Sequence, residues 1–102
     1  GSPGGSRIIT MVLQVLINVI DHGLNIAEAT AAVRVHHQWL PDKLFVERGL
    51  GPDTLELLRQ RGHAPKVSRA AGSVQSVMRL ANGGGFLGAS DPRSQGALTA
   101  GY

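Results

Sequence analysis

A stretch of thirteen residues constrains the fold more than any other feature of this sequence. Ten of the thirteen residues from Ile8 to Ile20 are apolar. The three polar residues, Thr10, Gln14 and Asn18, recur every four positions, so they would share one narrow stripe of an α-helix. A helix that is apolar on nearly every other side is normally buried between layers. We therefore expect a helix from Arg7 to about Asp21 that is covered on most sides in the complete protein and that exposes an apolar patch in this chain.

We do not expect this stretch to cross a membrane or to act as a secretory leader. A bilayer-spanning helix needs about 20 predominantly apolar residues, more than the stretch supplies. A leader would carry a basic start and a small-residue cleavage site, and neither flanks the stretch. The helix is therefore expected to pack within protein.

The composition is that of one small domain without cysteine chemistry. The chain has 102 residues, 42% of them hydrophobic and 17% charged, and residues 1–102 are expected to form a single domain. Because cysteine is absent, disulfide scaffolds, thiolate metal sites and cysteine nucleophiles are excluded. The net charge of +3 comes from Lys and Arg residues spread singly along the chain, so we expect no nucleic-acid partner.

Capping signals mark the ends of the first two helices. Ser6 is expected to cap the start of the first helix, and Gly23 is expected to end it. Asn25 and Glu28 have the spacing of a capping box, which predicts a second helix over residues 26–33.

Short strands and one further helix account for most of the remaining chain. We predict strands over residues 44–48, 66–69, 74–80 and 86–90, and a helix over residues 52–61. Asn82-Gly83, between the last two strands, is a strong hairpin signal. We expect residues 36–42 to be a connector and residues 91–102 an irregular closing segment. This order indicates an α/β (α+β) fold with a mixed or antiparallel sheet and covering helices.

A glycine-rich loop, Pro3-Gly4-Gly5-Ser6, stands directly before the first helix. Consecutive glycines let the backbone approach a ligand, and N–H groups at a helix N-terminus attract negative charge. Such a loop can bind an anion or stabilise an oxyanion. A plain turn before a helix gives the same pattern, and on spacing alone the plain turn is favoured.

The histidines and serines offer weaker signs of chemistry. His36 and His37 are adjacent, with His22 and His63 elsewhere, but neighbouring side chains diverge and no Asp or Glu stands at a helical spacing from the pair. We expect the pair to hydrogen-bond the backbone, and we expect no metal and no cofactor. Because no Gly-x-Ser-x-Gly sequence is present, Ser-His-Asp catalysis is not indicated.

Several stretches, taken in order, resemble one protein family. The most specific are HHQWLPD at 36–42 and GASDPR at 88–93. The others are GSPGGSRIIT at 1–10, VIDHGLNIAEA at 19–29, PDTL at 52–55, GS at 72–73, QS at 75–76 and AGY at 100–102. Together they resemble the C-terminal part of the small subunit of gamma-glutamyltranspeptidases, also called glutathione hydrolases, over essentially the whole chain.

The resemblance implies the fold and the chemistry of that family. The fold is that of an N-terminal nucleophile hydrolase, an αββα sandwich. A precursor cleaves itself into a large and a small subunit, and the new N-terminal threonine takes the gamma-glutamyl group from glutathione and passes it to water, an amino acid or a peptide. The location is periplasmic, secreted or at the outer cell surface. Gly4 and Gly5 match the oxyanion-hole glycines of the family, so with the resemblance the oxyanion interpretation is preferred.

The resemblance also implies that part of the machinery lies elsewhere. The nucleophilic threonine and the paired serines of the family precede the matched residues, and Thr10 lies in a predicted helix without a free amine. We expect the chain alone to be inactive, with the rest of the small subunit and the large subunit as partners. Met11 stands where the family often has threonine and is not expected to touch the chemistry. The alternative is a non-enzymatic interaction module or truncated homologue that binds a partner through a sheet edge.

Overall fold

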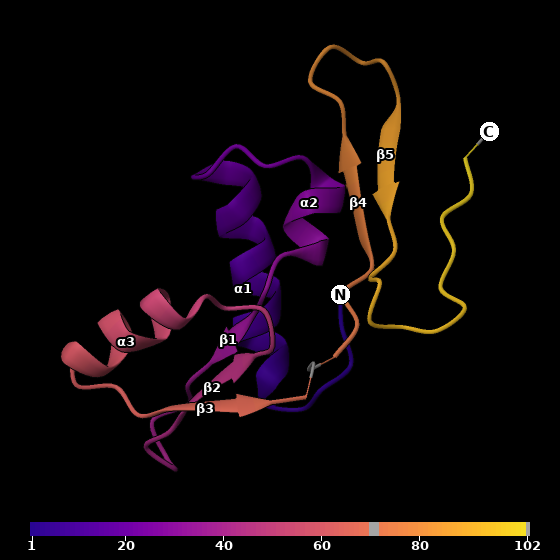
Figure 1. Cartoon of the computed structure of the whole chain (residues 1–102). Coiled ribbons are helices and arrows are strands. Elements are labelled where there is room, and N and C mark those ends of the chain that lie inside the picture. The colour runs from indigo at the N-terminus through magenta and orange to yellow at the C-terminus, as the bar shows by residue number, and fades with distance from the viewer. Residues whose placement is uncertain (70–71, 102) are drawn as a thin grey trace.

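Two helices open the chain, and short strands with one further helix among them follow (Figure 1). The computed structural model describes residues 1–69 and 72–101. Its elements in these ranges are α1 (Arg7–Ile20), α2 (Ile26–Ala31), β1 (Val35–His36), β2 (Leu44–Glu47), α3 (Pro52–Gln60), β3 (Pro65–Ser68), β4 (Ser76–Arg79) and β5 (Phe86–Ala89). Residues 91–101 form turns and irregular backbone, as predicted.

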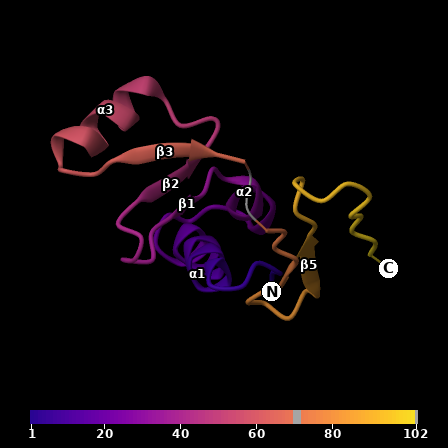
Figure 2. The same cartoon turned by 90° about the horizontal axis from the view of Figure 1, so that it is seen from below.

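The strands form a mixed three-stranded sheet and a separate hairpin. β1 is antiparallel to β2, with Val35 opposite Val46, and β2 is parallel to β3, with Val46 opposite Val67. α3 lies in the crossover that a parallel pair requires. β4 and β5 pair antiparallel, with Val77 opposite Gly88, which confirms the predicted hairpin. In Figure 2 the three-stranded sheet lies between α1 and α3.

Local sequence signals set the ends of the helices. Each predicted helix and strand is present, with ends that agree to within two residues. The capping box is confirmed, because the N–H of Glu28 donates to Asn25 Oδ1 at 2.9 Å and the N–H of Asn25 donates to Glu28 Oε2 at 3.2 Å. Gly23 ends α1 with a φ of 66°, and the N–H of Leu24 donates to the carbonyl of Asn18 at 2.9 Å.

Two local predictions are wrong. Ser6 precedes α1, but its backbone is already helical (φ −61°, ψ −19°) and its side chain makes no capping hydrogen bond. Residues 36–42 are not all connector, because His36 belongs to β1. A strand of two residues is too short to show an alternating pattern, so only its partners in space reveal it.

The polar stripe of α1 completes the hydrogen bonding of β1. Gln14 Oε1 accepts from the N–H of Val35 at 2.9 Å, and Gln14 Nε2 donates to the carbonyl of Val35 at 2.7 Å. The side-chain amide thus pairs with β1 as a neighbouring strand would. Unpaired backbone groups at a sheet edge need such partners when they are buried.

Only one face of α1 is covered. Met11 and Val15 are buried where α1 packs against α2 and β1. The opposite face leaves four large apolar side chains 50–74% exposed: Ile9, Leu13, Leu16 and Ile20. The apolar patch expected for this chain is therefore present, because the elements in contact with α1 leave this face open. A contiguous apolar face of this kind is typical of a surface that packs against other protein.

The main apolar core is small and aliphatic. It lies between α1, α2 and the hairpin, and consists of Met11, Val15, Ile26, Ala29, Val74 and Ala89.

Within residues 1–69 and 72–101, no helix is long and apolar enough to cross a membrane.

Three buried charged side chains and the partly buried Arg93 meet where the C-terminal segment contacts α2 and β2. Arg34, Glu47 and Asp91 are at most 6% exposed. Arg34 Nη1 lies 2.7 Å from Asp91 Oδ2, and Arg93 Nη1 lies 3.1 Å from Asp91 Oδ1. Arg93 Nε donates to Glu47 Oε1 at 2.9 Å. Residues far apart in the sequence therefore share one ion network.

The network also binds backbone groups. Asp91 Oδ2 accepts from the N–H of Val74 at 2.7 Å. Arg34 Nη2 and Arg93 Nη1 donate to the carbonyl of Thr30 at 2.7 and 3.1 Å. Burial acts to raise the pKa of Asp91, but hydrogen bonds from the backbone of Arg93 and Val74 and from the Arg34 and Arg93 side chains outweigh burial and hold that pKa below its ordinary value.

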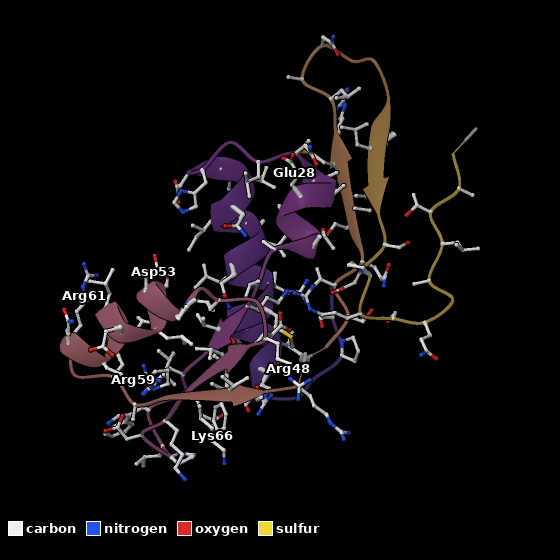
Figure 3. All side chains as sticks on the ribbon, viewed as in Figure 1. Glu28, Arg48, Asp53, Arg59, Arg61 and Lys66 are labelled. Carbon is white, nitrogen blue, oxygen red and sulfur yellow. The ribbon has the colours of Figure 1, made fainter. Side chains whose placement is uncertain are left out.

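The cations at the α3 end of the molecule contrast with this network. Figure 3 shows Arg59, Arg61 and Lys66 around α3 and β3, and all three are exposed. Arg59 Nη1 lies 3.4 Å from Glu56 Oε2 in a pair open to solvent. Exposed pairs contribute little to stability, so the ionic contacts that hold this fold are the buried ones.

We expect Asp91→Asn to lower the free energy of unfolding of the complete protein by about 3–5 kcal/mol, because it leaves buried arginines without their partner. The folded-state pKa of Asp91 is depressed. The contribution of the ionised Asp91 carboxylate to the free energy of unfolding is therefore fully present above its unfolded-state pKa of 3.8. This contribution is lost as the pH falls below that pKa. Denaturant titrations at pH 7 and below about pH 4 measure both effects.

The matched control for this prediction is Asp53→Asn, at an exposed aspartate in the first turn of α3. The control should change stability by less than about 1 kcal/mol. Asp91→Asn protein with the stability and acid sensitivity of the parent would contradict the role assigned to the network.

Candidate functional site

The glycine loop forms an exposed turn that leads into α1. The carbonyl of Gly4 accepts from the N–H of Arg7, and the carbonyl of Gly5 accepts from the N–H of Ile8, both at 3.1 Å. Gly4 has a φ of 143° and Gly5 a φ of 57°. Residues with a side chain rarely adopt these values, so the backbone conformation itself requires glycine at both positions.

The N–H groups of these two glycines are available to a ligand. Within residues 1–69 and 72–101, neither the N–H of Gly4 nor the N–H of Gly5 donates a hydrogen bond. Both residues are exposed, and they precede a helix of 14 residues. The helix adds a partial positive field at this end. Two adjacent donors in such a field can receive a negatively charged oxygen.

Backbone pairing anchors the start of the loop. The nitrogen of Gly1 donates to the carbonyl of Gln75 at 2.9 Å, and the N–H of Gln75 donates to the carbonyl of Gly1 at 2.8 Å. Ser2 Oγ accepts from the N–H of Ser73 at 3.1 Å. Because Asp91 binds the N–H of residue 74, the buried ion network holds the same segment that pairs with the loop.

Met11 packs directly beneath Gly4. A Cβ added at Gly4 would stand 2.7 Å from Met11 Cε, and a Cβ at Gly72 would stand 2.6 Å from the same methyl group. The side chain of Met11 therefore occupies the space between the loop and the core. Met11 thus supports the backbone of the loop from the core side, and its lack of contact with the chemistry stays a prediction.

Hydrogen bonds hold both histidines of the adjacent pair. His36 Nδ1 lies 2.7 Å from Thr10 Oγ1, and His36 Nε2 lies 3.0 Å from Gln38 Oε1. His37 Nδ1 accepts from the backbone N–H of Trp39 at 3.1 Å. The predicted bond to the backbone is confirmed for His37. It is wrong for His36, whose ring bonds side chains.

The other candidate residues lie apart from one another. His22 and His63 are exposed and follow the ends of α1 and α3, and Thr10 lies inside α1 without a free amine. In the described ranges no three His, Cys, Asp or Glu side chains are placed to hold a metal ion. Tyr102, which closes the AGY stretch, lies outside the described residues.

Two motifs whose roles were not evident from the sequence add to the support of the glycine loop. Gln38, in HHQWLPD, accepts from Ser6 Oγ at 2.9 Å. Asp91 and Arg93, in GASDPR, belong to the buried ion network. In the sequence, the indication that these residues matter was that both motifs are specific to the family that the chain resembles. The partners of these residues are distant in the sequence, so spacing could not identify them.

Comparison with known sequences finds matches along essentially the whole chain. The family model described as Gamma-glutamyltranspeptidase matches residues 1–101. The glutathione hydrolase proenzyme of Escherichia coli K12 is 61% identical over 102 residues, which are 100% of this chain and 17% of that protein. The proenzyme of Pseudomonas sp. A14 is 38% identical over 100% of this chain and 19% of that protein. The chain thus spans less than a fifth of these relatives.

Solved structures agree with the sequence matches. The crystal structure of an acivicin-inhibited gamma-glutamyltranspeptidase has a TM-score of 0.87 and 46% identity, over 93% of this chain and 52% of that one. Gamma-glutamyltranspeptidase from Pseudomonas nitroreducens in complex with L-DON has a TM-score of 0.86 and 35% identity, over 100% and 54%. The predicted fold class, α/β (α+β) within an N-terminal nucleophile hydrolase, is confirmed.

We expect Gly4→Ala to destabilise the complete protein more than Gly5→Ala. Both changes force a residue with a side chain into a sparsely populated backbone conformation, which costs about 1–3 kcal/mol. Only the Cβ at Gly4 also meets the Met11 methyl group, whereas Gly5 has no atom within 4 Å of such a Cβ. Denaturant titration measures the difference. Gly83→Ala, in the hairpin turn with a φ of 74° and open space around it, is the matched control. Equal losses at Gly4 and Gly5 would contradict the packing of Met11 under the loop.

Proposed function

Because the chain belongs to the gamma-glutamyltranspeptidase family, we propose that it is the C-terminal part of the small subunit of a gamma-glutamyltransferase/glutathione hydrolase. The complete enzyme transfers the gamma-glutamyl group of glutathione to water, an amino acid or a peptide. The E. coli and Pseudomonas relatives, both glutathione hydrolase proenzymes, support this substrate and a self-processing precursor.

The partners in this proposal are the rest of the small subunit and the large subunit. The exposed apolar face of α1, formed by Ile9, Leu13, Leu16 and Ile20, supports such a partner, because a face of this kind is typical of a packing surface. The nucleophile is the N-terminal threonine of the processed small subunit, outside this chain. On the same family resemblance, the complete enzyme is periplasmic, secreted or at the outer cell surface.

The observation that carries the proposal is the pair of available N–H groups at Gly4 and Gly5. When a nucleophile attacks the gamma-carbonyl carbon, the carbonyl oxygen gains negative charge. Donors that are fixed before the reaction stabilise this charge without reorganising. The turn hydrogen bonds and Met11 fix the two glycines, and the field of α1 adds to their effect. The segment therefore supplies the oxyanion hole.

We expect removal of the Gly5 N–H to lower kcat of the complete, processed enzyme by about 10²–10³-fold, the typical effect of losing an oxyanion-hole donor. The effect on KM should be smaller. Gly5→Pro removes the N–H, but proline fixes φ near −65°, whereas Gly5 has a φ of 57°. An amide-to-ester replacement at Gly5, made by semisynthesis, removes the N–H alone. Steady-state kinetics with a gamma-glutamyl anilide measure the loss.

Gly5→Ala is the matched control, because it keeps the N–H while straining the same turn. It should retain more activity than Gly5→Pro or the ester. Processing is verified first, so that only mature enzyme is compared. A processed ester variant with near-normal kcat would show that the loop is a plain turn before a helix.

We expect the 102-residue chain alone to release no glutamate and no chromogenic product from a gamma-glutamyl anilide, because the attacking group is absent. Co-production with the remaining parts of the protein should restore turnover. A rate that persists through stringent purification of the chain, and is lost when one of its residues is changed, would overturn the proposal. If co-production fails to restore turnover, the result would favour the non-enzymatic interaction module instead.

A further inference from the structure

Gln38 connects the HHQWLPD stretch to the glycine loop. Its Oε1 accepts from Ser6 Oγ at 2.9 Å, and Ser6 directly follows Gly5. The same oxygen lies 3.0 Å from His36 Nε2. One side-chain amide oxygen therefore joins the end of the loop to β1.

The amide of Gln38 is held in one orientation. Its Nε2 donates to the carbonyl of Leu40 at 2.8 Å, which directs Oε1 toward Ser6 and His36. The N–H of Leu40 donates to the carbonyl of Gln38 at 2.9 Å, across Trp39, whose φ is 70°. A non-glycine residue keeps such a conformation only where its surroundings enforce it. The tight turn at Trp39 thus places the carbonyl that orients the amide.

His36 provides a rigid base for this arrangement. Its side chain is buried, and its ring stacks on Phe45 with the ring centres 6.3 Å apart. Because an amide oxygen can only accept, His36 Nε2 carries a proton and donates it to Gln38 Oε1. His36 Nδ1 contacts Thr10 Oγ1 in α1. The side chains of Thr10 and His36 therefore connect the first turns of α1 to β1.

We propose that Gln38 is a positioning residue for the oxyanion donors of Gly4 and Gly5, an inference that rests on the proposed function. Gln38 holds Ser6 and so fixes the end of the glycine turn, while the contact between Ser2 and Ser73 fixes its start. It acts on the reaction only through the orientation of the two N–H groups. A displacement of about 1 Å in a catalytic group can cost about 10²-fold in rate, so this anchor affects kcat.

The test compares substitutions of Gln38 in the complete, processed enzyme, with kcat expressed per titrated active site. Gln38→Leu should lower kcat by at least about 10-fold and leave KM within about twofold. Gln38→Glu keeps an acceptor for Ser6 and His36 but places a carboxylate oxygen against the Leu40 carbonyl, so it should be as slow as Gln38→Leu or slower. Gln60→Leu is the matched control, because Gln60 lies on α3, across the three-stranded sheet from α1, and its amide contacts Glu56 (Figure 2).

Ser6→Ala provides a second route to the same contact. If Gln38 acts through Ser6, the double variant Ser6→Ala/Gln38→Leu loses no more kcat than Gln38→Leu alone. If the kcat losses of the two single variants multiply in the double variant, the proposal is wrong. A Gln38→Leu enzyme as fast as the Gln60→Leu control would also overturn it.

The ester at Gly5 distinguishes the two ways in which this inference can fail. Normal kcat in the ester variant would disprove the oxyanion role of the loop, and with it the proposed contribution of this segment. A slow ester variant together with a normal Gln38→Leu enzyme would disprove only the positioning role of Gln38.

Discussion

The carboxylate of Asp91 receives hydrogen bonds from the backbone of Val74 and Arg93 and from the guanidinium groups of Arg34 and Arg93. Through these contacts the C-terminal segment, α2 and the residues before β4 meet at one buried point. Residues 73–75 in turn pair with the start of the glycine loop. A charge is costly to bury unless hydrogen bonds and opposite charges surround it. The loop is therefore held in part by a residue near the other end of the chain.

The glycine loop is anchored on three sides, and each anchor uses a different interaction. Backbone pairing and Ser2 hold its start, Met11 fills the space beneath Gly4, and Gln38 holds the side chain of Ser6 at its end. None of these contacts uses the N–H groups of Gly4 and Gly5. Donors that are rigid and still available are what electrostatic stabilisation of an oxyanion requires.

The polar stripe and the apolar side of α1 make different contacts. Its polar stripe completes β1, where the amide of Gln14 bonds both backbone groups of Val35. Its apolar side divides into a buried half, around Met11 and Val15, and an open half that includes Ile9 and Ile20. This chain spans less than a fifth of its full-length relatives, and its open apolar face is the surface that the proposed partners would cover.

The sequence by itself determined the local structure, because caps, turns and hydrophobic periodicity act between near neighbours. Asn25 with Glu28, Gly23 and Asn82-Gly83 each predicted an element end or a turn that the structure has. The glycine loop was also identified from sequence, and the family resemblance selected its oxyanion interpretation. Only the tertiary structure decided that β1 exists, that Met11 supports Gly4, and that Gln38 and Asp91 hold the loop. These contacts join residues that are distant along the chain, so spacing carries no information about them, and only folding brings their side chains together.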